Sequence, residues 1–167
     1  FRSKCDKYKA EELTDELQEK LWLETVKDNI FVICKTPMAK QITKRTLVGY
    51  KMAPVNAHYF DDLINMMKNK PENFVNKVKR PGYWDKEEKE MKFDAVVGNP
   101  PYQEITNGSV DSQSTPVYNY FIEESMNLNP KYVSMITPAR WLNGGFGLDK
   151  FRERMLSDNR FRVLHDY

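Results

Sequence analysis

A short apolar strand that runs directly into two prolines is the feature that most constrains this sequence. Residues 93–98 (Phe-Asp-Ala-Val-Val-Gly) are typical of a strand, and Asn99-Pro100-Pro101-Tyr102 follows at once. Proline fixes φ and has no N–H group to donate, so the carbonyls of this segment are free to accept hydrogen bonds. The residue before a proline is biased to an extended conformation. We therefore predict a rigid ledge with one amide, outward-facing carbonyl oxygens and an aromatic face.

Such a ledge suits an amino group attached to a flat ring. The amino group of adenine or cytosine is a poor nucleophile because its lone pair is delocalised into the ring. Two acceptors at its N–H bonds, here the Asn99 side-chain oxygen and a proline carbonyl, pull it toward tetrahedral geometry. An adjacent aromatic ring can stack on the base, a contact of about 1–3 kcal/mol. The pattern favours direct displacement at a methyl sulfonium, which needs positioning and charge placement but no covalent intermediate.

Composition limits the class of protein. The 167 residues are 40% hydrophobic and 30% charged, which indicates a soluble, globular domain with a real core. A net charge of +2 means that any nucleic-acid contact must come from a local patch. Cys5 and Cys34 have neither metal nor disulfide spacing, so we expect a reduced, cytoplasmic setting and no metal site. No apolar stretch approaches the roughly 18 residues that cross a bilayer, so we expect no membrane partner.

Strand and helix patterns alternate along the chain. They predict helices at 8–27, 37–48, 58–69, 116–128 and 151–156, and strands at 29–33, 93–98, 132–136 and 161–164. Residues 70–92 are polar, and we expect a surface insertion there with a short strand near Phe74-Val75. The alternation favours one α/β domain over 1–167 with parallel neighbouring strands. Ligands then bind beyond the carboxyl ends of the strands, where residues 34–37, 99–102 and 137–141 should converge.

Residues 93–102 resemble the catalytic motif of S-adenosylmethionine-dependent amino-methyltransferases. The resemblance is to the adenine-N6 DNA methylases of type I and type IIG restriction–modification systems, and it implies a Rossmann-like, class I methyltransferase sheet of seven strands. It implies that Asn99 and the Pro100 carbonyl hold the target amino group, with Pro101 completing the catalytic motif and Gly98 and Asn99 beside the cofactor. Tyr102 would stack on a DNA base flipped out of the duplex. In this family, Asn rather than Ser at position 99 favours adenine over cytosine.

Two further segments resemble the same methylases. Residues 29–39 are similar to the second cofactor motif, in which an acidic residue binds the ribose hydroxyls, but Cys34 occupies the acidic position. A thiol cannot accept a pair of strong hydrogen bonds from a diol as a carboxylate can. Residues 132–151 resemble the strand and loop after the catalytic motif, and they make Arg140 and Trp141 candidates for nucleic-acid contact. The alternatives are solvation for Arg140 and ordinary packing for Trp141.

The family's glycine-rich cofactor motif has no counterpart here, because none of the seven glycines precedes the strand at 29–33. We expect the first strand and its glycine-rich loop before Phe1, and a recognition domain, with a fused or associated endonuclease, beyond Tyr167. On that expectation, the catalytic domain is partial, and residues 1–167 alone bind S-adenosylmethionine weakly or not at all and are inactive.

The sequence leaves three functions open. The first is methylation of adenine N6 in DNA within a restriction–modification enzyme. The second is methylation of RNA or of a protein glutamine, because the same tetrapeptide occurs in enzymes of both kinds. The third is a catalytically inactive methylase-like module that binds nucleic acid, to which Cys34 in the acidic position gives some weight.

Overall fold

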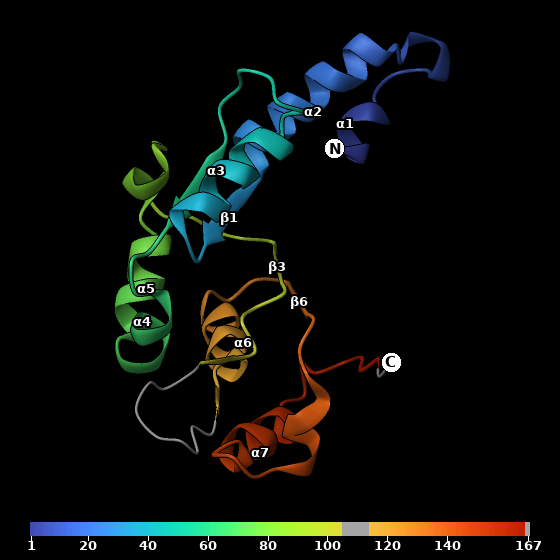
Figure 1. Cartoon of the computed structure of the whole chain (residues 1–167). Helices are drawn as coiled ribbons and strands as arrows, with labels where there is room; N and C mark the ends of the chain where they lie inside the picture. The colour runs from blue at the N-terminus through green and yellow to red at the C-terminus, as the bar shows by residue number, and fades with distance from the viewer. Residues whose placement is uncertain (105–113, 166–167) are drawn as a thin grey trace. The chain divides into compact units, whose positions relative to one another are not determined.

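The computed structural model describes residues 1–104 and 114–165 (Figure 1). The chain divides into two compact units, Phe1–Leu63 and Ile64–Tyr167. Each unit contains a pair of parallel strands with helices, so the predicted α/β class with parallel neighbours is observed within each unit.

Unit 1 is built around the parallel strands β1 and β2. Its elements are α1 (Arg2–Cys5), η1 (Ala10–Glu12), α2 (Asp15–Asn29), β1 (Phe31–Cys34), α3 (Pro37–Thr46) and β2 (Asn56–Tyr59). The helix expected at 8–27 is thus a short 3₁₀ turn followed by α2. This helix begins where the Thr14 hydroxyl accepts a hydrogen bond from the Leu17 N–H group at 3.2 Å. The predicted strand before Cys34 and the helix that starts at Pro37 are confirmed.

The helix predicted over 58–69 is wrong in its first half, which belongs to strand β2, and only α4 (Leu63–Asn69) is helical. A tertiary contact explains the difference. The Asn56 side-chain amide donates to the backbone carbonyls of Lys27 at 2.7 Å and Ile30 at 3.1 Å. These bonds hold residue 56 beside the start of β1 and place the following residues in register with it, which outweighs the local helical pattern.

Unit 2 contains the predicted ledge. Its elements after α4 are α5 (Pro71–Val78), η2 (Pro81–Trp84), β3 (Ala95–Gly98), β4 (Gln103–Glu104), β5 (Thr115–Pro116), α6 (Tyr118–Asn127), β6 (Tyr132–Met135), η3 (Ala139–Asn143) and α7 (Asp149–Ser157). Strands β3 and β6 run side by side in parallel, with Gly98 opposite Met135 (Figure 1). Strands β4 and β5 form a short antiparallel pair directly after the ledge.

Two other expectations for unit 2 need correction. Residues 70–92 are more than a polar surface connection, because Phe74 and Val78 on α5 and Trp84 on η2 are buried, and the strand expected near Phe74-Val75 is helix. The 74/78 spacing is one helical turn, and Trp84 Nε1 donates to the Val78 carbonyl at 2.7 Å. The strand expected at 161–164 is wrong as well, because those residues form no strand pairing in the described chain.

The core of unit 2 joins the segment after the ledge to the C-terminal helix. We call it the α6–α7 core; it comprises Tyr118, Ile122, Trp141, Leu148, Phe151 and Met155. The Trp141 and Phe151 rings meet edge to face, with centroids 5.8 Å apart, and the Tyr118 and Phe151 ring centroids are 6.5 Å apart. Because α6 and η3 both enter this core, it fixes the two elements relative to each other.

Truncation of Leu148 tests this core. Leu148 is 1% exposed, so Leu148→Ala should lower the free energy of unfolding by about 2–5 kcal/mol through lost burial and the cavity left behind. The matched control is Leu156→Ala on α7, a leucine that is 57% exposed and should cost less than about 0.5 kcal/mol. Denaturant unfolding measures both. Equal losses in the two variants would contradict the packing described.

Candidate active site

The ledge, residues Asn99–Tyr102, is fixed at both ends by backbone hydrogen bonds. At its start, the Gly98 carbonyl accepts from the Ile136 N–H group at 3.0 Å, just beyond β6. At its end, the Tyr102 carbonyl accepts from the Val117 N–H group at 3.1 Å, directly before α6. With the φ angles of both prolines locked as well, the backbone between these two anchors has little freedom.

The two ends of the ledge are exposed, and its two prolines are covered to different degrees. Pro100 is buried and Pro101 half-buried, while Asn99 and Tyr102 are exposed. The prolines therefore support the ledge from below, and the amide and the ring are presented outward. Gly98, directly before the ledge, packs closely against Met135. A Cβ atom on residue 98 would lie 3.0 Å from the Met135 sulfur.

A pocket of about 580 Å³ lies over the ledge. It is lined by Asn99, Pro100, Pro101, Tyr102, Gln103, Pro116, Tyr118, Pro138 and Arg140. The structure thus brings Arg140, which follows strand β6, to the same pocket as the ledge, which follows strand β3. None of these lining residues is a carboxylate, an imidazole or a thiol, so the pocket offers neutral hydrogen-bonding groups and one cation.

Tyr118 contributes a buried hydroxyl to one wall of the pocket. The side chain is 1% exposed, and its oxygen has no hydrogen-bond partner among the described residues. Burial raises the pKa of the Tyr118 phenol, and the nearby Trp141 backbone and the Arg140 charge oppose that rise in part. The phenol is therefore neutral at physiological pH and keeps its proton to donate.

Arg140 is exposed and stacks on the ring of Phe146. Its guanidinium carbon lies 3.7 Å from the Phe146 ring centroid, within the range of a cation–π contact. Among the described residues Arg140 forms no ion pair with a carboxylate. It is thus a cation at the pocket without a counter-charge.

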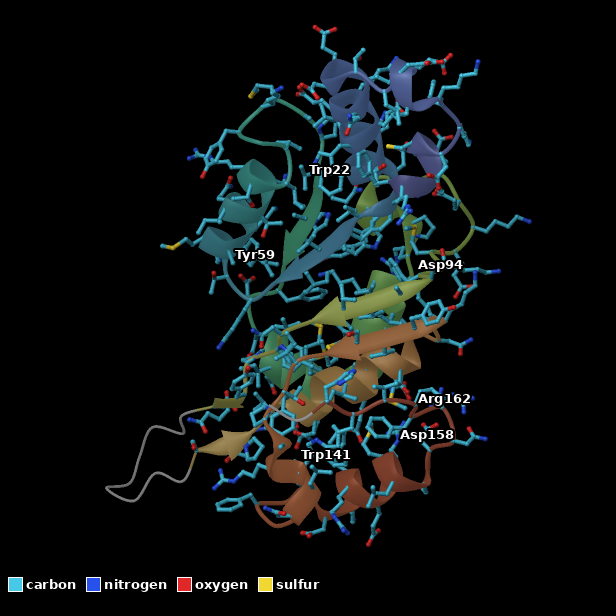
Figure 2. All side chains as sticks on the ribbon, turned by 90° about the vertical axis from the view of Figure 1, so that its right-hand side faces the viewer. Trp22, Tyr59, Asp94, Trp141, Asp158 and Arg162 are labelled. Carbon is cyan, nitrogen blue, oxygen red and sulfur yellow. The ribbon has the colours of Figure 1, made fainter. Side chains whose placement is uncertain are left out.

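Trp141 follows the packing alternative that the sequence leaves open for it. It is 4% exposed, belongs to the α6–α7 core and is not among the residues that line the pocket. Figure 2 shows its side chain between α6 and α7. Its neighbour Arg140 points the other way because η3 turns consecutive side chains to different sides. Trp141 therefore supports the pocket wall from behind.

Cys34 belongs to unit 1 and is the last residue of β1. Its side chain is buried, and Sγ lies 3.7 Å from the Thr43 hydroxyl on α3. A thiol that is already in contact with α3 leaves no strong acceptor for a ribose diol. Its role in cofactor binding, and its convergence with the ledge, stay predictions.

No cluster of three or more His, Cys, Asp or Glu side chains among the described residues is arranged to hold a metal ion. Within the same residues, no helix has the length and apolar character needed to cross a membrane.

Comparison with known proteins identifies the family. Residues 28–167 match the family described as Eco57I restriction-modification methylase, which covers the ledge, the pocket and both pairs of parallel strands. The chain belongs to the Eco57I restriction-modification methylase family. This membership supports the predicted resemblance to adenine DNA methyltransferases and suggests a Rossmann-like sheet.

A curated relative points the same way. The chain is 43% identical over 54 residues to a protein of Mycoplasma pneumoniae named "Uncharacterized adenine-specific methylase". The matched segment covers 31% of this chain and 13% of the relative. No solved structure matches the chain.

Two residues of the candidate site are not singled out by the sequence patterns. Tyr118, the first residue of α6, lies two residues after β5 and lines the pocket. Phe146 lies in the Gly144-Gly145-Phe146-Gly147 segment, which the sequence alone allows as a mobile loop over the substrate or as a plain connector. The glycines on both sides of Phe146 were the available signal, since they indicate a backbone held in an unusual conformation.

The orphan hydroxyl of Tyr118 can be tested by stability. A buried polar group without a partner carries an uncompensated desolvation cost, so Tyr118→Phe should raise the free energy of unfolding by about 1 kcal/mol. Tyr120→Phe on the same helix, where the side chain is half-buried, is the control and should change little. Thermal and denaturant unfolding without nucleic acid measure both. A clear loss in Tyr118→Phe would mean that the hydroxyl has a partner in the Trp141 backbone.

Proposed function

We propose that this chain carries the amino-acceptor side of the active site of an adenine-N6 DNA methyltransferase, within a restriction–modification protein. The observation that carries the proposal is the pocket over the ledge, where the exposed Asn99 amide and Tyr102 ring stand on a backbone anchored at both ends. Membership of the methylase family and the adenine-specific relative support the choice of reaction and base.

The ledge activates the amino group by orientation. The Asn99 side-chain oxygen and the Pro100 carbonyl accept hydrogen bonds from its two N–H groups, which directs the nitrogen lone pair away from the ring plane. Pro101 keeps the next carbonyl and the Tyr102 ring in a fixed position. Because none of the described residues that line the pocket is a general base, we propose that activation depends on this preorganised pair of acceptors rather than on prior removal of a proton.

S-adenosylmethionine is the methyl donor that the family resemblance implies; when bound, it supplies a methyl group on a sulfonium. The described residues do not fit its ribose, because Cys34 stands where a carboxylate is needed and its thiol contacts Thr43. Gly98 and Asn99, at the end of β3, are the positions proposed to lie beside the donor.

The substrate we propose is a nucleotide extruded from duplex DNA. A base inside the stack cannot reach acceptors on a ledge, so the target must flip, and Tyr102 then stacks on its exposed face. Sequence-specific binding calls for a recognition domain, and restriction calls for a fused or associated endonuclease; both are proposed as parts or partners of the intact protein. A cytoplasmic setting follows from a DNA substrate and two free cysteines.

The other two functions are less well supported by the site. A glutamine amide would satisfy the two ledge acceptors but makes no use of an exposed stacking ring or of an unpaired arginine beside it. A module that only binds nucleic acid needs no anchored pair of acceptors. RNA offers the same base and phosphate chemistry as DNA, and only a substrate comparison separates the two.

Removal of the Asn99 amide tests the role of the ledge. In the intact protein, Asn99→Ala should lower the rate of methyl transfer to unmethylated DNA by roughly 100-fold or more, because one of two preorganised acceptors is lost. Tritiated methyl transfer under single-turnover conditions measures this, with RNA and protein extract as parallel substrates. Asn73→Ala, an exposed asparagine on α5 outside the pocket, is the control. Full activity of the Asn99→Ala variant would contradict the proposal.

Replacement of Tyr102 tests base stacking. Tyr102→Phe keeps the ring and should bind DNA like the parent, whereas Tyr102→Ala should weaken binding by roughly 5-fold to 150-fold, the equivalent of about 1–3 kcal/mol. Fluorescence of 2-aminopurine at the target position reports the same loss as a less stable flipped state. Tyr132→Ala is the control, since this tyrosine is 71% exposed and does not line the pocket. Equal effects of the two alanine variants would argue against stacking.

A further inference from the structure

The turn after η3 has an unusual backbone. Four consecutive residues have positive φ angles: Gly144 (71°), Gly145 (77°), Phe146 (52°) and Gly147 (79°). For phenylalanine this left-handed conformation is strained, and such strain persists only where the surroundings impose it.

Contacts on both sides of the turn impose this conformation. The Asp149 carboxylate accepts a hydrogen bond from the Gly145 N–H group at 3.0 Å. The Arg152 side chain donates to the Leu142 carbonyl at 2.7 Å, and Leu148, directly after the turn, is locked in the α6–α7 core. A Cβ atom on Gly144 would lie 2.7 Å from the Asp149 carboxylate, so residue 144 must be glycine for this contact to form. These contacts fix the conformation of the turn, so it is more than a connector between η3 and α7.

The turn at residues 144–147 places the Phe146 ring against Arg140. Phe146 is 52% exposed, and its ring lies under the guanidinium of Arg140, 3.7 Å from centroid to Cζ. When a guanidinium stacks on a ring, its N–H groups lie in a plane parallel to the ring and point outward, where they can still donate hydrogen bonds. That planar array of donors matches two oxygens of a phosphate.

We infer that Arg140 binds a backbone phosphate of the nucleic acid next to the target nucleotide, and that Phe146 is a positioning residue that holds the guanidinium for this contact. The inference deepens the proposed function and rests on it: the pocket that Arg140 and Tyr102 share receives the base, and the phosphate lies at its rim. It commits the site to a nucleic acid substrate, because a protein glutamine has no phosphodiester to offer.

Electrostatics favour this assignment over a solvated arginine. The chain has a net charge of only +2, so attraction of its overall charge to DNA is small and a local contact such as Arg140 is needed. Arg140 has no carboxylate partner among the described residues, so its charge is not neutralised within unit 2. Holding it on Phe146 before binding reduces the side-chain entropy lost when the phosphate is gripped.

The salt dependence of DNA binding tests the phosphate contact. In the intact protein, Arg140→Gln should reduce the slope of log K against log salt concentration by about 0.9, the value for one phosphate contact, and weaken binding at low salt. Lys150→Gln on α7 is the matched control, since it removes one exposed cation outside the pocket and should leave the slope and the methylation rate unchanged. An unchanged slope in Arg140→Gln, or the same change in both variants, would overturn the assignment.

A variant cycle tests the positioning role of Phe146. Phe146→Leu should raise KM for DNA by roughly 2-fold to 5-fold with a smaller effect on kcat, the equivalent of about 0.5–1 kcal/mol for an exposed cation–π contact. Phe146→Tyr keeps the ring and should restore the parent value. In the Arg140→Gln background, Phe146→Leu should add nothing, because the group it positions is gone. Additive losses, or a loss that Phe146→Tyr does not rescue, would reduce Phe146 to a folding role and overturn the inference.

The outcomes also separate this inference from the proposed function. If Asn99→Ala keeps its activity while the Arg140 slope changes as expected, the chain binds nucleic acid but the ledge does not catalyse transfer. If Asn99→Ala is inactive and the slope does not change, the ledge role stands and the phosphate assignment fails. Transfer to protein extract without DNA binding overturns both.

Discussion

The site depends on two backbone hydrogen bonds, one at each end of the ledge. The Ile136 N–H group holds the Gly98 carbonyl, and the Val117 N–H group holds the Tyr102 carbonyl. Each donor lies next to a different element, β6 in the first case and α6 in the second. Because both prolines between these anchors have fixed φ angles, the orientation of Asn99 follows from the placement of β6 and α6.

The α6–α7 core extends this constraint to the rest of the pocket. Tyr118 opens α6 and Trp141 lies in η3, and both are buried in the same cluster. The wall after the ledge and the segment that carries Arg140 are therefore joined by packing rather than by direct contact across the pocket. Trp141 anchors η3 in this cluster, and η3 also carries Arg140. A buried tryptophan and an exposed arginine are therefore neighbours in sequence.

Sequence patterns located the parts of the site that depend on local chemistry, and missed those that depend on distant contacts. The strand that ends at Gly98, the ledge and the helix that begins at Pro37 follow from proline geometry and apolar spacing, which act within a few residues. Strand β2 was missed because its position comes from the Asn56 amide, whose acceptors are 26 and 29 residues away. The stacking of Arg140 on Phe146 was not predicted because it depends on the positive φ angles of residues 144–147, which side-chain spacing does not indicate.

The distribution of charge in the pocket fits a reaction at a neutral amine. The groups at the ledge are an amide and peptide carbonyls, and burial keeps the Tyr118 phenol protonated. A carboxylate beside the ledge would attract Arg140 into an ion pair and compete for the donors that a phosphate would use. Neutral acceptors at the ledge and one stacked cation at the rim avoid this competition. Under the proposed function, the ledge after β3 would orient the amino group and Arg140 after β6 would hold its nucleotide, so the two tasks would fall to different elements that share one core.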